Sequence, residues 1–145
     1  MRILSVDPGG TTGWAFVDED HLDLVTAGQA KQFEFCQMAE AHAIGVHKTP
    51  ADVIVIESYT VTPATIKLTR EYAALEIIGT CRYLAEAHGR KFKLQTPAAA
   101  KRFMTNERLR NLGWWRPGED HARDALRHLG LYLAEERNNR EVLSA

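Results

Sequence analysis

The first thirteen residues constrain the fold of this chain more than any other stretch. A short run rich in branched side chains, Ile3 to Val6, ends in Asp7 and is followed at once by the residues PGGTTG. Such a run is typical of a buried strand, and the Pro and Gly after it force the chain to reverse. A carboxylate at the end of a buried strand is costly unless it has a partner, such as a metal ion, a basic side chain or a helix end. The simpler alternative is that Asp7 forms a turn and caps the loop with its own side chain.

The next segments predict a meander followed by a crossover. Residues 14–17 and 21–28 have the composition of strands, and the short connections between them predict antiparallel neighbours. Residues 31–47 show helical spacing and precede Pro50, which indicates a crossover helix. Residues 52–57 (DVIVIE) form the clearest strand, and a strand reached through a helix lies parallel to and beside an earlier one. If that earlier strand is the first, Asp7 and Glu57 lie at corresponding ends of adjacent strands.

The second half of the chain supplies a long helix, a fifth strand and further helices. The long helix is expected over residues 63–88, the strand over 91–95, another helix from Pro97 and a last helix from residue 119 or 120. The sequence therefore predicts an α/β fold with a five-stranded mixed sheet flanked by helices. In this sheet, strands 1–3 are antiparallel and strands 4 and 5 run parallel to strand 1.

The long helix carries a second apolar stripe besides the one suited to the sheet. In a single domain such a stripe predicts a partner surface, most simply the same helix in a twofold-related copy, so we expect a homodimer. Burial of the stripe under a loop is the alternative. The residues of this stripe are Leu68, Tyr72, Leu75 and Gly79.

Length and composition predict one globular domain spanning residues 1–145. The 145 residues are too few for two ordinary domains, and 45% of them are hydrophobic and 26% charged. No apolar run approaches the roughly 20 residues that span a bilayer, and no signal-like region opens the chain, so we expect no membrane association and a cytoplasmic location. Cys36 and Cys81 lack zinc-ligand spacing and are expected to be free thiols. The polar tail from about residue 135 is expected to fray.

The net charge of −1 conceals a strongly basic segment. Residues 1–89 carry 6 basic and 12 acidic side chains, residues 90–127 carry 10 and 4, and residues 128–145 carry 2 and 3. A basic stretch in a near-neutral protein is the pattern expected where phosphates are bound, and a solvated helix face is the alternative. Arginine and tryptophan together can stack on unpaired bases and clamp phosphates, or the tryptophans can form a lid over a small core. The residues concerned are Arg102, Arg108, Arg110 and Arg116, with Trp114 and Trp115 among them.

Two further candidate ligands lie at the start of the last helix. His121 and Asp124 are three residues apart, so they share one face of that helix. With Asp7 and Glu57 they form a set of three acids and one imidazole, and the acids repel one another unless cations lie between them. Oxygen ligands favour Mg²⁺ or Mn²⁺, and two such ions about 4 Å apart catalyse phosphodiester hydrolysis. The sequence therefore predicts a two-metal nuclease site with these four residues as ligands, although a histidine on a helix is more often structural.

The order of these motifs resembles the RuvC family of Holliday-junction resolvases, and most of all its short, phage-type members. The matching features, spread over residues 2–133, are a strand ending in DPG with a following TG, a strand ending in Glu, and a late helix with a ligand three residues before DAL. The resemblance implies an RNase H-like fold, a homodimer paired through the helix after Glu57, and metal-dependent nicking of four-way DNA junctions in recombination and repair. It also implies the cytoplasm of a bacterium or of a phage-infected host cell. The family's four metal positions fall on Asp7, Glu57, His121 and Asp124, a basic DNA-binding position falls on Lys101, and a junction-unstacking aromatic falls on Tyr59.

Two features depart from the common family pattern. The turn after Asp7 is one residue shorter, and many members have Asp where this chain has His121, which puts metal preference and junction selectivity in question. The same residues would also serve an RNase H-like nuclease acting on flap DNA or structured RNA. A nucleic-acid-binding module that has lost its metals is a further alternative. Sugar-kinase and actin-like ATPases share a similar first turn but need two such domains, for which 145 residues leave no room.

Overall fold

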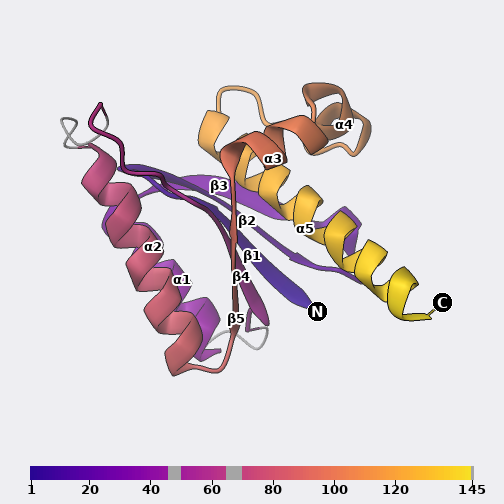
Figure 1. The fold of residues 1–145 in the computed structure, drawn as a ribbon, viewed down its shortest axis with the longest axis horizontal. Coiled ribbons are helices and arrows are strands. Elements are labelled where there is room, and N and C mark those ends of the chain that lie inside the picture. Colours follow the sequence, from indigo (N-terminus) through magenta and orange to yellow (C-terminus); the bar gives the residue numbers. More distant parts are fainter. Residues whose placement is uncertain (46–49, 65–69, 145) are drawn as a thin grey trace.

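The computed structural model describes residues 1–45, 50–64 and 70–144, and it contains one five-stranded sheet with the strand order β3-β2-β1-β4-β5 (Figure 1). β1 pairs antiparallel with β2, which pairs antiparallel with β3, whereas β4 and β5 run parallel to β1. The predicted mixed sheet and its strand directions are therefore confirmed. The strands are β1 (Arg2–Asp7), β2 (Thr11–Asp18), β3 (Thr26–Lys31), β4 (Val53–Glu57) and β5 (Lys91–Gln95).

The helices cover both faces of the sheet. Figure 1 shows α1 and α2 on one side, and α5 with the short α3 and α4 on the other. The helices are α1 (Gln32–Ile44), α2 (Arg70–Ala87), α3 (Pro97–Phe103), α4 (Asn106–Asn111) and α5 (Asp120–Ser144), and a 3-10 turn, η1 (Leu22–Leu24), follows β2. Thr96 and Thr105 cap α3 and α4 through their side-chain hydroxyls, which accept backbone N–H bonds from Ala99 and Arg108.

Alternation along the central strands divides the core into two layers. In β1, Ile3 packs in the core layer under α5, whereas Leu4 and Val6 pack in the layer under α1 and α2. β4 repeats this pattern. Val53 and Val55 belong to the layer under α5, and Ile54 and Ile56 belong to the layer under α1 and α2. Both strands are therefore buried on both faces, as the near-continuous apolar runs predicted. By the same period of two, the last residue of each strand lies on the α5 face.

The predicted third strand over residues 21–28 is only partly correct. Residues 22–24 form η1, and the strand begins at Thr26. The backbone N–H of His21 donates to the Asp18 carbonyl and that of Leu24 to the His21 carbonyl, so turn bonds occupy the groups that a strand would have used.

The long helix also begins later than predicted. Pro63 and Ala64 lie in a turn, and α2 runs from Arg70, while residues 65–69 lie outside the described part of the chain. Proline suits a turn as well as a first helical turn, which is why this boundary was wrong. At the other end of the chain, α5 continues through the polar segment expected to fray, as far as Ser144. None of the helices in the described segments has the length and apolar character needed to cross a membrane.

Candidate active site

Two carboxylates lie side by side at the ends of adjacent parallel strands. Val6 is paired with Ile56 in the register of β1 and β4, so the next residues, Asp7 and Glu57, are neighbours. Both follow the alternation onto the α5 face, which confirms the predicted convergence of the two strand ends. On the same face, the Ser5 hydroxyl donates to the Ala125 carbonyl at 2.7 Å and fastens α5 to the centre of the sheet.

A close backbone contact brings the first turn of α5 onto this edge. Gly13 is paired with Asp7 in β1 and with Gln29 in β3, and a Cβ atom at Gly13 would lie 1.8 Å from the His121 carbonyl oxygen. Only glycine permits this approach of backbone to backbone. The Gln29 side-chain oxygen accepts bonds from the backbone N–H groups of His121 (2.9 Å) and Ala122 (3.4 Å), and so satisfies two amides that have no partner within the helix.

The Asp7 carboxylate is the most perturbed group of the site. It is only 8% exposed, and its Oδ2 lies 2.9 Å from Nδ1 of His121. Burial, followed by the negative charge of Glu57, raises the pKa of the Asp7 carboxyl to about 7, with the His121 hydrogen bond opposing this and Asp124 adding to it. Glu57, His121 and Asp124 thus all lie near enough to Asp7 to change the pKa of its carboxyl.

Glu57 is held by a buried histidine. Its Oε2 lies 2.9 Å from Nε2 of His128, and Nδ1 of the same ring lies 2.9 Å from Oε1 of Gln95. Gln95 is the register partner of Glu57 in the neighbouring strand β5. The chain of bonds therefore links two strand ends through α5.

Asp124 is connected to the basic segment by an arginine. Nε of Arg127 donates to Oδ1 of Asp124 at 3.3 Å, and its two terminal nitrogens donate to the Met104 carbonyl and to Oδ1 of Asn106. Met104 and Asn106 form the junction between α3 and α4. Arg127 thus fixes the position of this junction relative to the carboxylate.

The side-chain oxygen and nitrogen atoms of the four candidate ligands are of the kinds that bind divalent cations. Three carboxylates and an imidazole face one region, and the pKa of Asp7 is raised by burial and then by the negative charge of Glu57, a charge that a cation would neutralise. The side chains as they stand do not enclose an ion, because among the described residues no three His, Cys, Asp or Glu side chains are grouped closely enough to hold one. Asp7 and Glu57 each place one oxygen against an imidazole, which leaves the second oxygen of each for another partner.

The arginines of the basic segment stack on aromatic rings. Arg108 lies over Phe103 with 4.6 Å from its guanidinium carbon to the ring centroid, and Arg110 and Arg123 lie over Trp115 at 4.1 and 4.5 Å. Trp114, by contrast, is buried in the core under α5, so the lid interpretation is correct for this tryptophan.

The remaining predicted contact residues are distributed over three elements. Lys101 and Arg102 are exposed on α3, and Arg116 donates to the Gly113 carbonyl at 3.5 Å in the loop before α5. Tyr59 follows β4 and is half-buried. On α2, Tyr72 and Leu75 are exposed and no atom crowds Gly79, whereas Leu68 lies outside the described residues.

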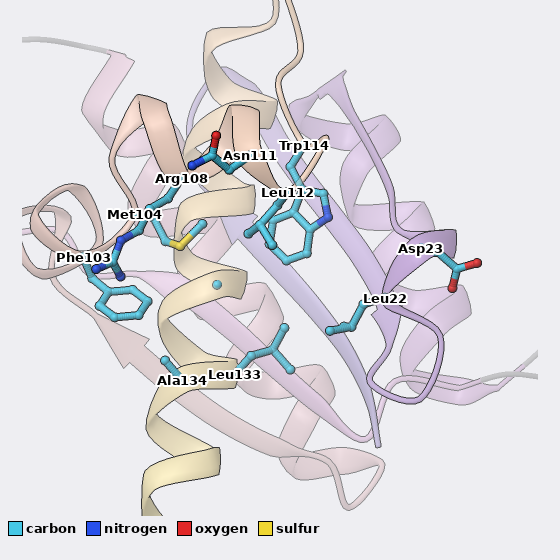
Figure 2. Close-up of a pocket in the computed structure, with 11 residues that line it drawn as sticks. Leu22, Asp23, Phe103, Met104, Arg108, Asn111, Leu112, Trp114, Leu133 and Ala134 are labelled. Carbon is cyan, nitrogen blue, oxygen red and sulfur yellow. The ribbon is translucent and has the colours of Figure 1, made fainter.

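An apolar cavity of about 490 Å³ lies beside the second half of α5 (Figure 2). It is lined by η1, the α3–α4 segment and the second half of α5, with Met104, Trp114 and Leu133 in its wall. Asp7, Glu57, His121 and Asp124 do not line it. The cavity is therefore separate from the candidate active site.

Sequence reasoning missed the residues that support the four candidate ligands. Gln29, Gln95, Arg127 and His128 were assigned no role at the site. One signal was available for His128, because it lies four residues after Asp124 and interrupts an apolar stripe of α5. The other three carry no comparable signal.

Comparison with known proteins shows which fold this is. No protein-family model and no curated protein matches the sequence. Among solved structures, a complex of Thermus thermophilus RuvC with a Holliday junction substrate matches with a TM-score of 0.70 and 17% identity over 94% of this chain and 95% of that one. A second Thermus thermophilus RuvC structure matches with a TM-score of 0.68 and 18% identity over 96% and 97%. The fowlpox virus Holliday junction resolvase matches with a TM-score of 0.57 and 15% identity over 93% and 99%. The predicted RNase H-like fold and the structural resemblance to RuvC are therefore confirmed.

Proposed function

We propose that this chain is a metal-dependent endonuclease that nicks four-way DNA junctions. The observation on which this rests is the meeting of Asp7 and Glu57 with His121 and Asp124 at one edge of the sheet, where burial and then the charge of Glu57 raise the pKa of Asp7 to about 7. The fold is that of RuvC, and one of the matching structures holds a Holliday junction substrate.

Asp7, Glu57, His121 and Asp124 would hold two Mg²⁺ or Mn²⁺ ions. The chemistry that such a pair supplies when bound is activation of water and stabilisation of the leaving oxygen of a phosphodiester. The chain itself contributes the orientation of these ligands, through Gly13 and the hydrogen bonds described above.

The basic segment beside this edge would bind the phosphates of DNA. Lys101 and Arg102 project from α3, and the α3–α4 junction is tied to Asp124 by Arg127. Phosphate contacts on this segment would therefore orient the scissile strand relative to the carboxylates. In this proposal Arg108, Arg110 and Arg116 make further phosphate contacts and Tyr59 meets the junction centre.

A homodimer formed through the exposed face of α2 would present two such sites to the two sides of a junction. Tyr72 and Leu75 are 53% and 39% exposed, and Gly79 beside them allows a close helix approach. Twofold symmetry of the protein would match the twofold symmetry of the junction, which gives paired nicks.

One observation favours a second candidate, a nucleic-acid-binding module without catalytic metals. Within the segments that the structure describes, no three of these side chains lie close enough together to hold an ion. Such a module would bind junctions through the basic segment and leave them intact.

Cleavage of labelled four-way, three-way, flap and linear duplex DNA, and of structured RNA, in Mg²⁺ and in Mn²⁺ tests the proposal. We expect paired symmetrical nicks in the four-way junction and none with Asp7→Asn. Asp23→Asn removes the same charge from exposed η1 and is the matched control, which should cleave as the wild type does. Preferential cleavage of flaps or RNA would assign another substrate, and binding without cleavage would assign the module.

A further inference from the structure

His128 has a position that core packing alone does not explain. It is 1% exposed and lies in α5 beside the buried Leu126 and Leu129. A buried imidazole is tolerated only when its nitrogens are hydrogen-bonded, and an apolar side chain of similar volume would fill the same space without that requirement. Both ring nitrogens are bonded, and both partners, Glu57 and Gln95, lie at the ends of strands at the candidate active site.

The orientation of the Gln95 amide decides whether Nδ1 of His128 carries a hydrogen, because Oε1 accepts a hydrogen bond and Nε2 donates one. Its Nε2 is a buried atom that has no hydrogen-bond partner in the orientation shown, with Oε1 facing Nδ1 of His128. Turning the amide over places the NH₂ group against Nδ1, where it donates to the lone pair of that nitrogen. Nε2 of His128 then carries the hydrogen and donates to Oε2 of Glu57.

We propose that His128, oriented by Gln95, is the positioning residue of Glu57, tying down Oε2 of this carboxylate so that Oε1 is the oxygen presented to a divalent cation. This inference rests on the proposed metal site, and it adds two residues of this chain to it. A glutamate has three rotatable side-chain bonds, and one fixed oxygen removes most of that freedom. Hydrogen-bond partners behind metal ligands change metal affinity by about 10- to 100-fold when they are removed.

Two neutral polar variants separate positioning from packing. In His128→Gln the amide nitrogen reaches the position of imidazole Nε2, so the bond to Glu57 is kept. In His128→Asn the shorter amide reaches only the position of Nδ1, so the bond to Gln95 is kept and the bond to Glu57 is lost. Both variants leave a polar group in the core, but asparagine is one methylene shorter and leaves the larger void, so Gln95→Met below supplies a comparison in which His128 is kept.

The test is Mn²⁺ binding by isothermal titration calorimetry on the full chain without DNA. We expect His128→Asn to weaken Mn²⁺ binding by about tenfold or more and His128→Gln to stay within about threefold of the wild type. Junction cleavage should show the same order, with a lower kcat and an unchanged KM for His128→Asn. If both variants bind Mn²⁺ as tightly as the wild type does, His128 has no role in positioning Glu57. If Mn²⁺ affinity falls equally in both variants, the loss is due to packing alone, which would also overturn the proposal.

Gln95→Met provides a measurement that does not depend on the folding of the His128 variants. It keeps His128 and removes only its second partner, so we expect Mn²⁺ affinity between that of the wild type and that of His128→Asn. Wild-type affinity in Gln95→Met would count against the proposal. If Mn²⁺ affinity follows the expected order but no junction is cleaved, the proposed substrate fails and the role of His128 stands. If the wild-type chain binds no Mn²⁺, both the proposed metal-dependent function and the proposed role of His128 fail.

Discussion

Replacing Asp7 by asparagine should stabilise the metal-free protein at neutral and alkaline pH. The pKa of Asp7 is raised from its ordinary value of 3.8 to about 7, chiefly by burial and then by Glu57. One pKa unit corresponds to about 1.4 kcal/mol, so the ionised carboxylate costs the folded state about 4 kcal/mol at pH 8. Asparagine has nearly the same shape and no charge. We therefore expect Asp7→Asn to gain up to about 4 kcal/mol, or about 10 °C in Tm for a chain of this size.

The sign of this effect depends on pH in a defined way. The folded protein keeps a proton on Asp7 that the unfolded chain has lost between pH 3.8 and about 7, so this group lowers stability as pH rises through that window. Near pH 3.5 Asp7 is mostly protonated in both states and contributes almost nothing to stability. The advantage of Asp7→Asn should consequently be absent at pH 3.5, grow between pH 4 and 7, and be constant above pH 7.5.

Urea unfolding in EDTA at pH 3.5, 6 and 8 measures this difference. Asp23→Asn in exposed η1 is the matched control and should leave the stability within about 0.5 kcal/mol of the wild type. Mn²⁺ should narrow the difference in stability between Asp7→Asn and the wild type, because an ion at 100 times its Kd adds about 2.7 kcal/mol only to a chain that binds it. A destabilised Asp7→Asn at pH 8 in EDTA, or a gain independent of pH, would refute the idea of a crowded carboxylate.

The remaining predictions concern the approach of α5 to the sheet and the binding of DNA. Gly13→Ala places a Cβ atom against the His121 carbonyl, so urea unfolding should show a loss of about 3 kcal/mol, whereas Gly10→Ala, where the added atom meets nothing within 4 Å, should be nearly neutral. A stable Gly13→Ala variant would contradict the contact. Junction affinity can be measured by fluorescence anisotropy at several salt concentrations. The slope of log K against log [salt] should become about 0.9 shallower in Lys101→Gln, because one phosphate contact is lost. Lys91→Gln, at the opposite end of β5 from Gln95, is its control, and equal slopes for both would remove Lys101 from the DNA surface.

The placement of Asp7 beside Glu57 was predictable because it depends only on local rules. Two strand signals, one helical connection and the preference of such connections for adjacent parallel strands suffice to bring both strand ends together. His121 and Asp124 share a face by helical spacing alone. In each case, residues close in sequence define an element, and the element positions the side chain.

The support behind these ligands was not predictable for the opposite reason. Gln29 bonds to residues of α5 more than ninety positions away, and His128 bonds to Glu57 across 71 positions. Glutamine and histidine have many possible partners, so their identity indicates none of them before the distances are known. The apolar character of Leu22 and Leu24 was likewise a poor guide, since turn hydrogen bonds rather than hydrophobicity decide the path of η1.

The dependence of the candidate site on α5 has a consequence for the order in which this site is assembled during synthesis of the chain. Asp7 and Glu57 emerge early, within a sheet edge that β2 and β4 already complete, whereas His121 and Asp124 come from residues made more than sixty positions after Glu57. A growing chain that has folded its first four strands holds two of the four candidate ligands and lacks the helix that supports them. A nuclease built this way would leave the nucleic acid around the ribosome uncut until almost the whole domain has been translated.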